Sequence, residues 1–130
     1  MRKILYVILG FFTVMIAAIF IGIVYLQSGM SSTKSLTITS IDLSLVDDGI
    51  YEGTYENGRF TTTIEVTIVD HMITELVVID DVTFANPDVT RALFDQIITS
   101  QDIDIDIIAG STITTKAYLK AIENALKGGL

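Results

Sequence analysis

The sequence has no cysteine, no tryptophan, one proline and one histidine. The lack of cysteine excludes disulfides, cysteine-bound iron–sulfur clusters and c-type haem attachment. A zinc site would lack its usual ligands. Nucleophilic catalysis needs a base beside the nucleophile, and the one imidazole, His71, lies in a predicted turn where we expect it to be exposed. A calcium loop from Asp102 would need Gly and Glu where Ile107 and Ile113 stand. We therefore predict no catalytic constellation built from protein side chains alone.

Charge is also missing from a long N-terminal stretch, because Ile4–Leu26 contains no charged residue. Roughly 20 apolar residues are enough to cross a bilayer core about 30 Å thick. Two cations precede the stretch and the next is Lys34, which favours a cytoplasmic N-terminus. We predict a single-pass anchor at residues 1–27 in the cell membrane, with the C-terminal domain extracellular. A cleaved signal peptide is the alternative, because residues 28–31 are small, although its apolar region usually spans only about 7–15 residues.

Positive charge is scarce in the rest of the chain. Six basic and all sixteen acidic residues follow the anchor, so this part carries a net charge of −10. A strongly acidic surface disfavours nucleic acid as a partner and disfavours lying flat on anionic lipid. An acidic surface commonly serves solubility.

Hydrophobic periodicity predicts one small domain over residues 41–130, joined to the anchor by a polar linker over 28–40 whose composition is typical of a flexible tether. Weak alternation over 36–46 predicts a lead-in strand. Alternation over 50–56, 59–69 and 73–79 predicts an antiparallel meander. Asn57-Gly58 is expected to join its first two strands in a two-residue turn. The second strand should place one set of residues on one face: Phe60, Thr62, Ile64, Val66 and Ile68.

Two helices are predicted to follow the meander. Asn86 is the expected N-cap of a helix from Pro87 to about Ser100, in which Arg91 is expected to be solvated. Alternating Asp and Ile over 102–107 predicts a short strand, and a last helix should run from about Ile113 or Thr114 to Lys127. The predicted class is α+β, a small antiparallel meander packed with two helices after the transmembrane helix, in the order β-β-β-α-β-α.

Hydroxyl groups gather immediately before the last predicted helix. Free backbone N–H groups and the positive end of the helix dipole make this a generic site for phosphate. The plainer interpretation is that Thr112, Thr114 or Thr115 caps the helix.

Two segments resemble the FMN-binding domain family. Asp106-x-x-Ala109-Gly110-Ser111-Thr112 is similar to its motif Asp-x-x-Ser/Thr-Gly-Ala-Thr, with departures at Ala109 and Ser111. The segment from Asp48 to Gly53, with Gly49 and Tyr51 between, resembles the opening of such domains, although its two glycines also suit a turn and a bulge. The members that resemble this chain are membrane-anchored and related to the flavinylated subunits of sodium-pumping quinone reductase and similar electron-transport complexes.

The resemblance implies FMN bound covalently by a phosphodiester to Thr112, attached by a flavin transferase. It implies that Asp106 serves transferase recognition or orients the loop, that Gly110 lets the backbone approach the phosphate, and that Ser111, Thr114 and Thr115 hold phosphate oxygens. Such a protein relays electrons between redox partner proteins and is not a stand-alone enzyme. The departures leave covalent FMN, non-covalent FMN and a lost cofactor open.

Two other functions are compatible with the same residues. One is an extracytoplasmic binding or regulatory module, without catalysis, for another anionic ligand or a partner protein. The other is a purely structural surface domain.

Overall fold

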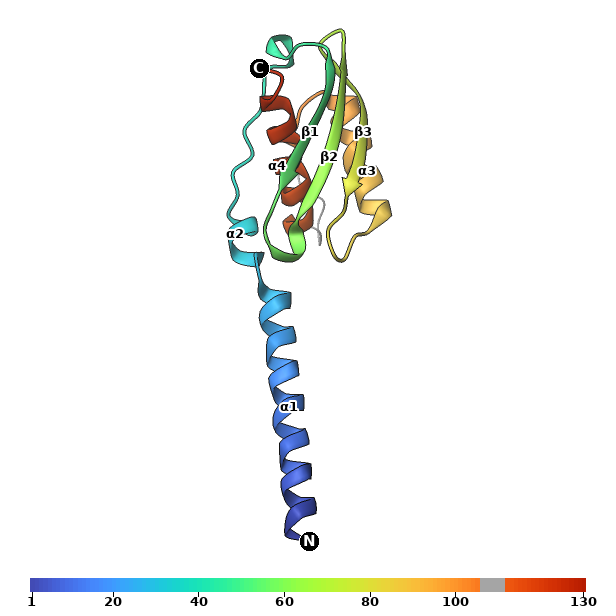
Figure 1. The fold of residues 1–130 in the computed structure, drawn as a ribbon. Coiled ribbons are helices and arrows are strands. Elements are labelled where there is room, and N and C mark those ends of the chain that lie inside the picture. Colours follow the sequence, from blue (N-terminus) through green and yellow to red (C-terminus); the bar gives the residue numbers. More distant parts are fainter. Residues whose placement is uncertain (106–111) are drawn as a thin grey trace.

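The computed structural model describes residues 1–105 and 112–130 (Figure 1). A long helix precedes a small domain in which helices pack on one antiparallel sheet, so the predicted α+β class is confirmed. The elements in chain order are α1 (Arg2–Gln27), α2 (Met30–Lys34), the 3₁₀ helix η1 (Leu43–Leu45), β1 (Gly49–Tyr55), the 3₁₀ helix η2 (Gly58–Phe60), β2 (Thr62–Val69), β3 (Met72–Asp80), α3 (Pro87–Ser100) and α4 (Thr112–Lys127).

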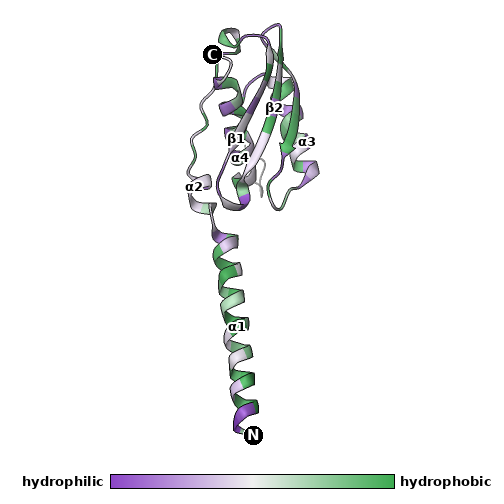
Figure 2. Ribbon diagram, viewed as in Figure 1, coloured by the Kyte–Doolittle hydropathy of each residue, from purple (hydrophilic) through white to green (hydrophobic). Residues whose placement is uncertain are grey.

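Helix α1 projects away from the domain, and none of its residues is buried (Figure 1). Apolar residues dominate along its whole length (Figure 2). By length and composition it can cross a membrane, a test that an N-terminal signal sequence also passes.

The strands form a sheet in the order β1-β2-β3 with antiparallel neighbours. Helices α3 and α4 lie on one face of this sheet (Figure 1). The residues predicted to point inward from the second strand are all buried, with Phe60 at the end of η2 and the others on β2: Thr62, Ile64, Val66 and Ile68. The core between sheet and helices includes Ile73, Leu93, Ile97, Tyr118, Leu119, Ile122 and Leu126.

The connection between β1 and β2 is longer than the predicted two-residue turn. Tyr55 pairs with Thr62, so residues 56–61 form the connection and include η2. The Asn57 amide nitrogen lies within hydrogen-bond distance of Ser32 Oγ (2.6 Å) and Thr33 Oγ1 (3.2 Å). Asn57 therefore serves a contact with α2, and its side chain is not free for a tight hairpin.

Two short predicted strands are not formed. Residues 36–46 contain η1 and no strand, because the Asp42 carboxylate accepts the Ser44 N–H and closes a turn. Residues 102–105 also form no strand. There Asp102 accepts hydrogen bonds from Asp104 N–H and Ser40 Oγ, and such local bonds compete with a strand ladder. The rest of that predicted strand lies outside the described residues.

Helix α3 matches its prediction at both ends. Asn86 caps it by accepting the Asp88 N–H at 3.1 Å, and Pro87 is its first residue. Arg91 is exposed and lies 3.7 Å from Asp88, which agrees with the predicted solvated position.

Asp48 supports the turn between β2 and β3. Its carboxylate accepts the N–H groups of His71 (3.0 Å) and Asp70 (2.9 Å), two residues with positive φ. These hydrogen bonds hold the pKa of Asp48 below its ordinary value. His71 is an exposed turn residue, as predicted. This turn lies at the end of the domain away from α1, so Asp48 has a structural role in the fold (Figure 1).

Gly53 allows helix α4 to lie directly against β1. A Cβ atom at residue 53 would come 2.0 Å from the Ala121 carbonyl oxygen and 2.3 Å from the Ala125 nitrogen. Both are backbone atoms of α4, so the helix would have to move away from the sheet. The glycine of the opening motif is therefore required by packing.

Replacing Gly53 with Ala should destabilise the domain by about 1–3 kcal/mol or more, because overpacking against backbone cannot relax by a rotamer change. Urea unfolding of the full chain in detergent, followed by circular dichroism, measures the loss. Gly49→Ala is the matched control, since its Cβ would meet only the Tyr51 side chain at 3.3 Å. Equal stability of Gly53→Ala and the natural chain would contradict this account.

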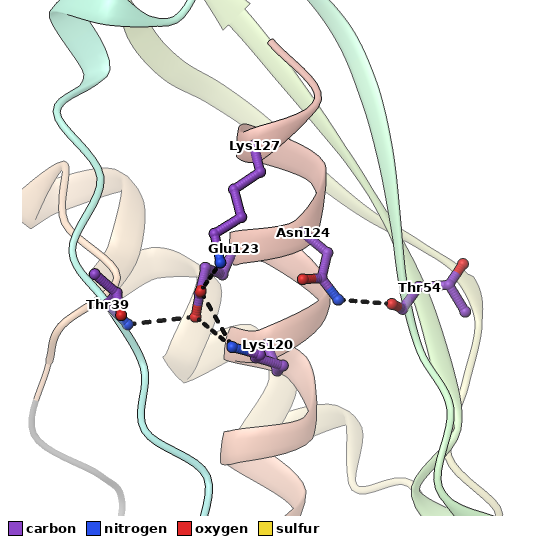
Figure 3. Close-up of polar contacts among 6 residues, drawn as sticks. All are labelled: Thr39, Thr54, Lys120, Glu123, Asn124 and Lys127. Atoms are coloured by element: carbon purple, nitrogen blue, oxygen red, sulfur yellow. Dashed lines mark hydrogen bonds and ion pairs between the residues drawn. The ribbon is translucent and has the colours of Figure 1, made fainter. Parts of the chain in front are cut away.

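A buried carboxylate fastens the polar segment after α2 to α4 (Figure 3). Glu123 is fully buried and accepts hydrogen bonds from Lys120 at 3.1 Å, from Lys127, and from the Thr39 N–H at 3.3 Å. Burial alone would raise the pKa of Glu123, but the hydrogen bonds from Lys127, Lys120 and Thr39 outweigh it, so the pKa is lowered. The segment predicted to be a flexible tether thus contains a fixed contact.

Replacing Glu123 with Gln should lower the free energy of unfolding by about 1.5–3 kcal/mol at pH 7, the range for hydrogen bonds to charged groups. Because the folded pKa is lowered, the stabilisation is present above the unfolded value of about 4.5 and is lost as the pH falls through the folded pKa. Denaturant unfolding between pH 3 and pH 7 should therefore show the two chains converging below about pH 4.5. A constant difference across this range would refute the role of the charge.

Candidate functional site

A cavity of about 420 Å³ lies at the start of α4, a size within the usual range for small-molecule sites. Its walls come from α2, η2, the loop after β3 and the first turn of α4. The lining residues are Lys34, Arg59, Phe60, Val82, Phe84, Thr112, Ile113 and Thr114. Among the described residues, this lining holds two cations and no acidic side chain, although the domain as a whole is strongly acidic.

The other four cations of the domain are engaged with protein groups. Lys120 and Lys127 contact Glu123, Arg91 lies near Asp88, and Lys116 Nζ donates to backbone carbonyl oxygens. Within residues 1–105 and 112–130, the charged groups of Lys34 and Arg59 form no ion pair and no hydrogen bond. The two cations that remain available both line the cavity at α4.

Arg59 lies beside two aromatic rings. Its Cζ atom is 4.6 Å from the centre of the Phe60 ring and 5.7 Å from that of Phe84. Its Nε atom is buried and finds no partner among the described residues. The backbone of Arg59 is held in place because its carbonyl oxygen accepts the Thr83 N–H at 3.0 Å. Gly58 provides the positive φ that this turn requires.

A second cavity of the same volume offers the opposite charge. It lies between β3 and α3, and its lining includes Glu75, Asp81, Asp95 and Arg91. The Asp81 carboxylate also accepts a short hydrogen bond from the buried Tyr118 hydroxyl. Burial and this hydrogen bond raise the pKa of Tyr118. An anionic ligand is therefore expected at the first cavity and not at the second.

The structure places the predicted site residues in three ways. Thr112 is the first residue of α4, is exposed and lines the first cavity together with the half-buried Thr114. Thr115 is fully buried and is not part of the lining, and its Oγ1 has no partner within the described ranges. Asp106, Gly110 and Ser111 lie outside the described residues. Of the predicted site residues that are described, Thr112 and Thr114 are thus together at the cavity.

The elements that line the cavity, among them α2 and the start of α4, lie at the end of the domain to which α1 is attached (Figure 1). The Tyr25 hydroxyl in α1 lies 3.4 Å from Thr83 Oγ1, in the loop that also carries Phe84. On η2, a Cβ at residue 58 would come 2.6 Å from Ser28 Oγ, so this turn touches the end of the long helix. Two walls of the cavity, one formed by η2 and the other by the loop after β3, therefore contact α1 or the residue that ends it.

Sequence reasoning missed four residues of this site: Lys34, Arg59, Phe60 and Phe84. They come from three segments far apart in the chain, and no spacing between them marks a motif. The available signal was the scarcity of cations in the domain, since a cation without a nearby acid in such a chain is a candidate for an anionic ligand. Only the folded structure shows that Lys34 and Arg59 line the same cavity.

The arrangement suits a ligand with one anionic end and one flat apolar part. The N-terminus of α4, the hydroxyls of Thr112 and Thr114 and the charge of Lys34 can hold phosphate oxygens. Phe60, Phe84 and the planar guanidinium of Arg59 can contact an aromatic ring system. Among the described residues no cluster of three or more metal-ligating side chains is present.

Comparison with protein families agrees with this ligand chemistry. The model of a family described as FMN-binding domain matches residues 22–127, well over half of the chain. No curated protein and no solved structure matches the chain.

Proposed function

The chain belongs to the FMN-binding domain family, whose cofactor is FMN, and we propose that it carries FMN covalently on Thr112 and relays electrons at the outer face of a membrane. The single observation that supports this most strongly is the cavity at the start of α4. There an exposed threonine hydroxyl lies beside the two cations that have no protein partner in the described chain.

Thr112 has the position that attachment requires. It begins α4, so its hydroxyl is near free backbone N–H groups that stabilise negative charge on phosphate oxygens. In the proposed linkage the donor is a flavin dinucleotide. A bond forms between Thr112 Oγ and the phosphorus of its FMN half while the P–O–P bond breaks, the nucleoside monophosphate leaves with the hydroxyl proton, and the net addition is FMN minus one water. A flavin transferase is the partner that makes this bond. Thr114 and Lys34 hold the remaining phosphate oxygens.

The protein part supplies no redox group of its own, and bound FMN supplies the electron-transfer chemistry. The chain holds the flavin, excludes part of the solvent with Phe60 and Phe84, and positions it close to α1. Electrons would enter from one redox partner protein and leave to another, which makes the chain a carrier and not a stand-alone enzyme.

The membrane arrangement is supported by the charges at the start of α1. Arg2 and Lys3 are its first two residues, and they favour a cytoplasmic N-terminus with the domain outside. Its short connection to the domain, through Ser28 and α2, keeps the cavity close to the outer membrane surface.

Covalent attachment is tested by co-expressing the full chain with a flavin transferase and locating the added mass by peptide mass spectrometry. We expect FMN minus water on Thr112, no addition in Thr112→Ala, and restored addition in Thr112→Ser, because serine keeps the hydroxyl. Thr74→Ala removes an exposed threonine hydroxyl at the second cavity and is the matched control that should keep the flavin on Thr112. Flavin that co-purifies without an added mass would support non-covalent FMN, and a chain without any flavin absorbance would refute the proposal.

A further inference from the structure

We propose that the two cations lining the cavity, which have no partner among the described residues, act on different parts of the flavin, with Lys34 pairing the phosphate and Arg59 facing the isoalloxazine ring. The inference rests on the proposed function, because it takes FMN to occupy the cavity at Thr112. It assigns Arg59 as a positioning residue that also favours the reduced state of the ring.

Lys34 is fixed next to the start of α4. Lys116 Nζ donates to the carbonyl oxygens of Lys34 (2.7 Å) and Leu36 (3.0 Å), which ties the end of α2 to this helix. Lys116 lies about one helical turn after Thr112. The backbone of Lys34 is therefore held beside the helix end where the phosphate would be attached, and its flexible ammonium suits phosphate oxygens as a point charge.

Arg59 reaches the cavity from η2, in the connection between β1 and β2. Its guanidinium is planar, lies between the rings of Phe60 and Phe84, and keeps a buried Nε without a partner among the described residues. A planar cation next to aromatic groups offers a flat surface on which another ring can stack. Phe84 is 62% exposed and Arg59 is half-buried, so the ring of Phe84 beside the guanidinium is open to a ligand. These features fit the ring of the flavin better than its phosphate.

The charge of Arg59 has a consequence for reduction. When a donor delivers two electrons and one proton comes from solvent, the isoalloxazine ring gains one negative charge. A cation beside the ring stabilises that charge more than it stabilises the neutral oxidised ring. Arg59 is thus expected to raise the reduction potential, whereas Lys34, on the phosphate, interacts with both redox states nearly alike.

The first experiment separates the ring from the phosphate without any covalent attachment. The full chain, expressed without transferase and purified in detergent, is titrated with FMN and with riboflavin, which lacks the phosphate, while flavin fluorescence is measured. Arg59→Gln should weaken both ligands about tenfold, in line with the loss of one good cation–π contact. Lys34→Gln should weaken FMN and leave riboflavin unchanged. Unchanged riboflavin binding in Arg59→Gln would overturn the inference.

The second experiment measures the midpoint potential of the flavinylated chain by reductive titration with dithionite, followed by flavin absorbance. Arg59→Gln should lower it by about 30 mV or more, which corresponds to a tenfold change in the two-electron equilibrium. Arg59→Lys keeps the charge and should stay closer to the natural chain, and Lys34→Gln should shift the potential by less than a third as much. Equal shifts in Arg59→Gln and Lys34→Gln would also overturn the inference.

The outcomes distinguish the inference from the proposed function. If the natural chain binds neither flavin and acquires no added mass, both fail together. If the natural chain is flavinylated on Thr112 and Arg59→Gln changes neither riboflavin affinity nor potential, only the role of Arg59 fails. Thermal unfolding of each variant, with Arg59→Lys as the conservative comparison, shows whether a loss of binding comes from a loss of fold.

Discussion

The backbone of α4 occupies the space where a side chain on β1 would otherwise lie, at Gly53. This contact sets the distance between the helix and the sheet, and the core residues of α4 are packed at that distance. The first turn of the helix lies at the α1 end of the domain (Figure 1). The position of Thr112 beside the cavity thus depends on a glycine on the facing strand.

Charge is distributed unevenly for a physical reason. A domain with a net charge of −10 tends to engage its few cations internally, and four of the six do contact protein groups. In the described part of the chain, Lys34 and Arg59 have no such contact, because their neighbours in the cavity are aromatic, aliphatic or hydroxyl-bearing. The described walls of the cavity therefore carry positive charge on an acidic domain, which favours an anionic ligand and disfavours cationic ones.

Much of the fold could be predicted from local pattern, because α3, its Asn86 cap and the inward face of β2 depend on neighbouring residues only. Predictions failed where a side chain is used by a distant segment: Asn57 contacts α2 instead of forming a tight turn, and Asp102 is bonded to Ser40. At the cavity, the approximate start of α4 and the importance of Thr112 could be predicted, because the residues that indicate them are continuous in the sequence. Lys34 and Arg59 could not, since only the packing of α2 and η2 around α4 brings them together.

The contacts between α1 and the cavity walls have a mechanical consequence. Tyr25 meets Thr83, and the end of the helix meets the turn at Gly58, so a change in the tilt of α1 would bear on two walls of the cavity. A membrane-spanning helix adjusts its tilt to bilayer thickness. With α1 in a bilayer, the height and angle of the cavity above the surface would therefore depend on the thickness of the membrane.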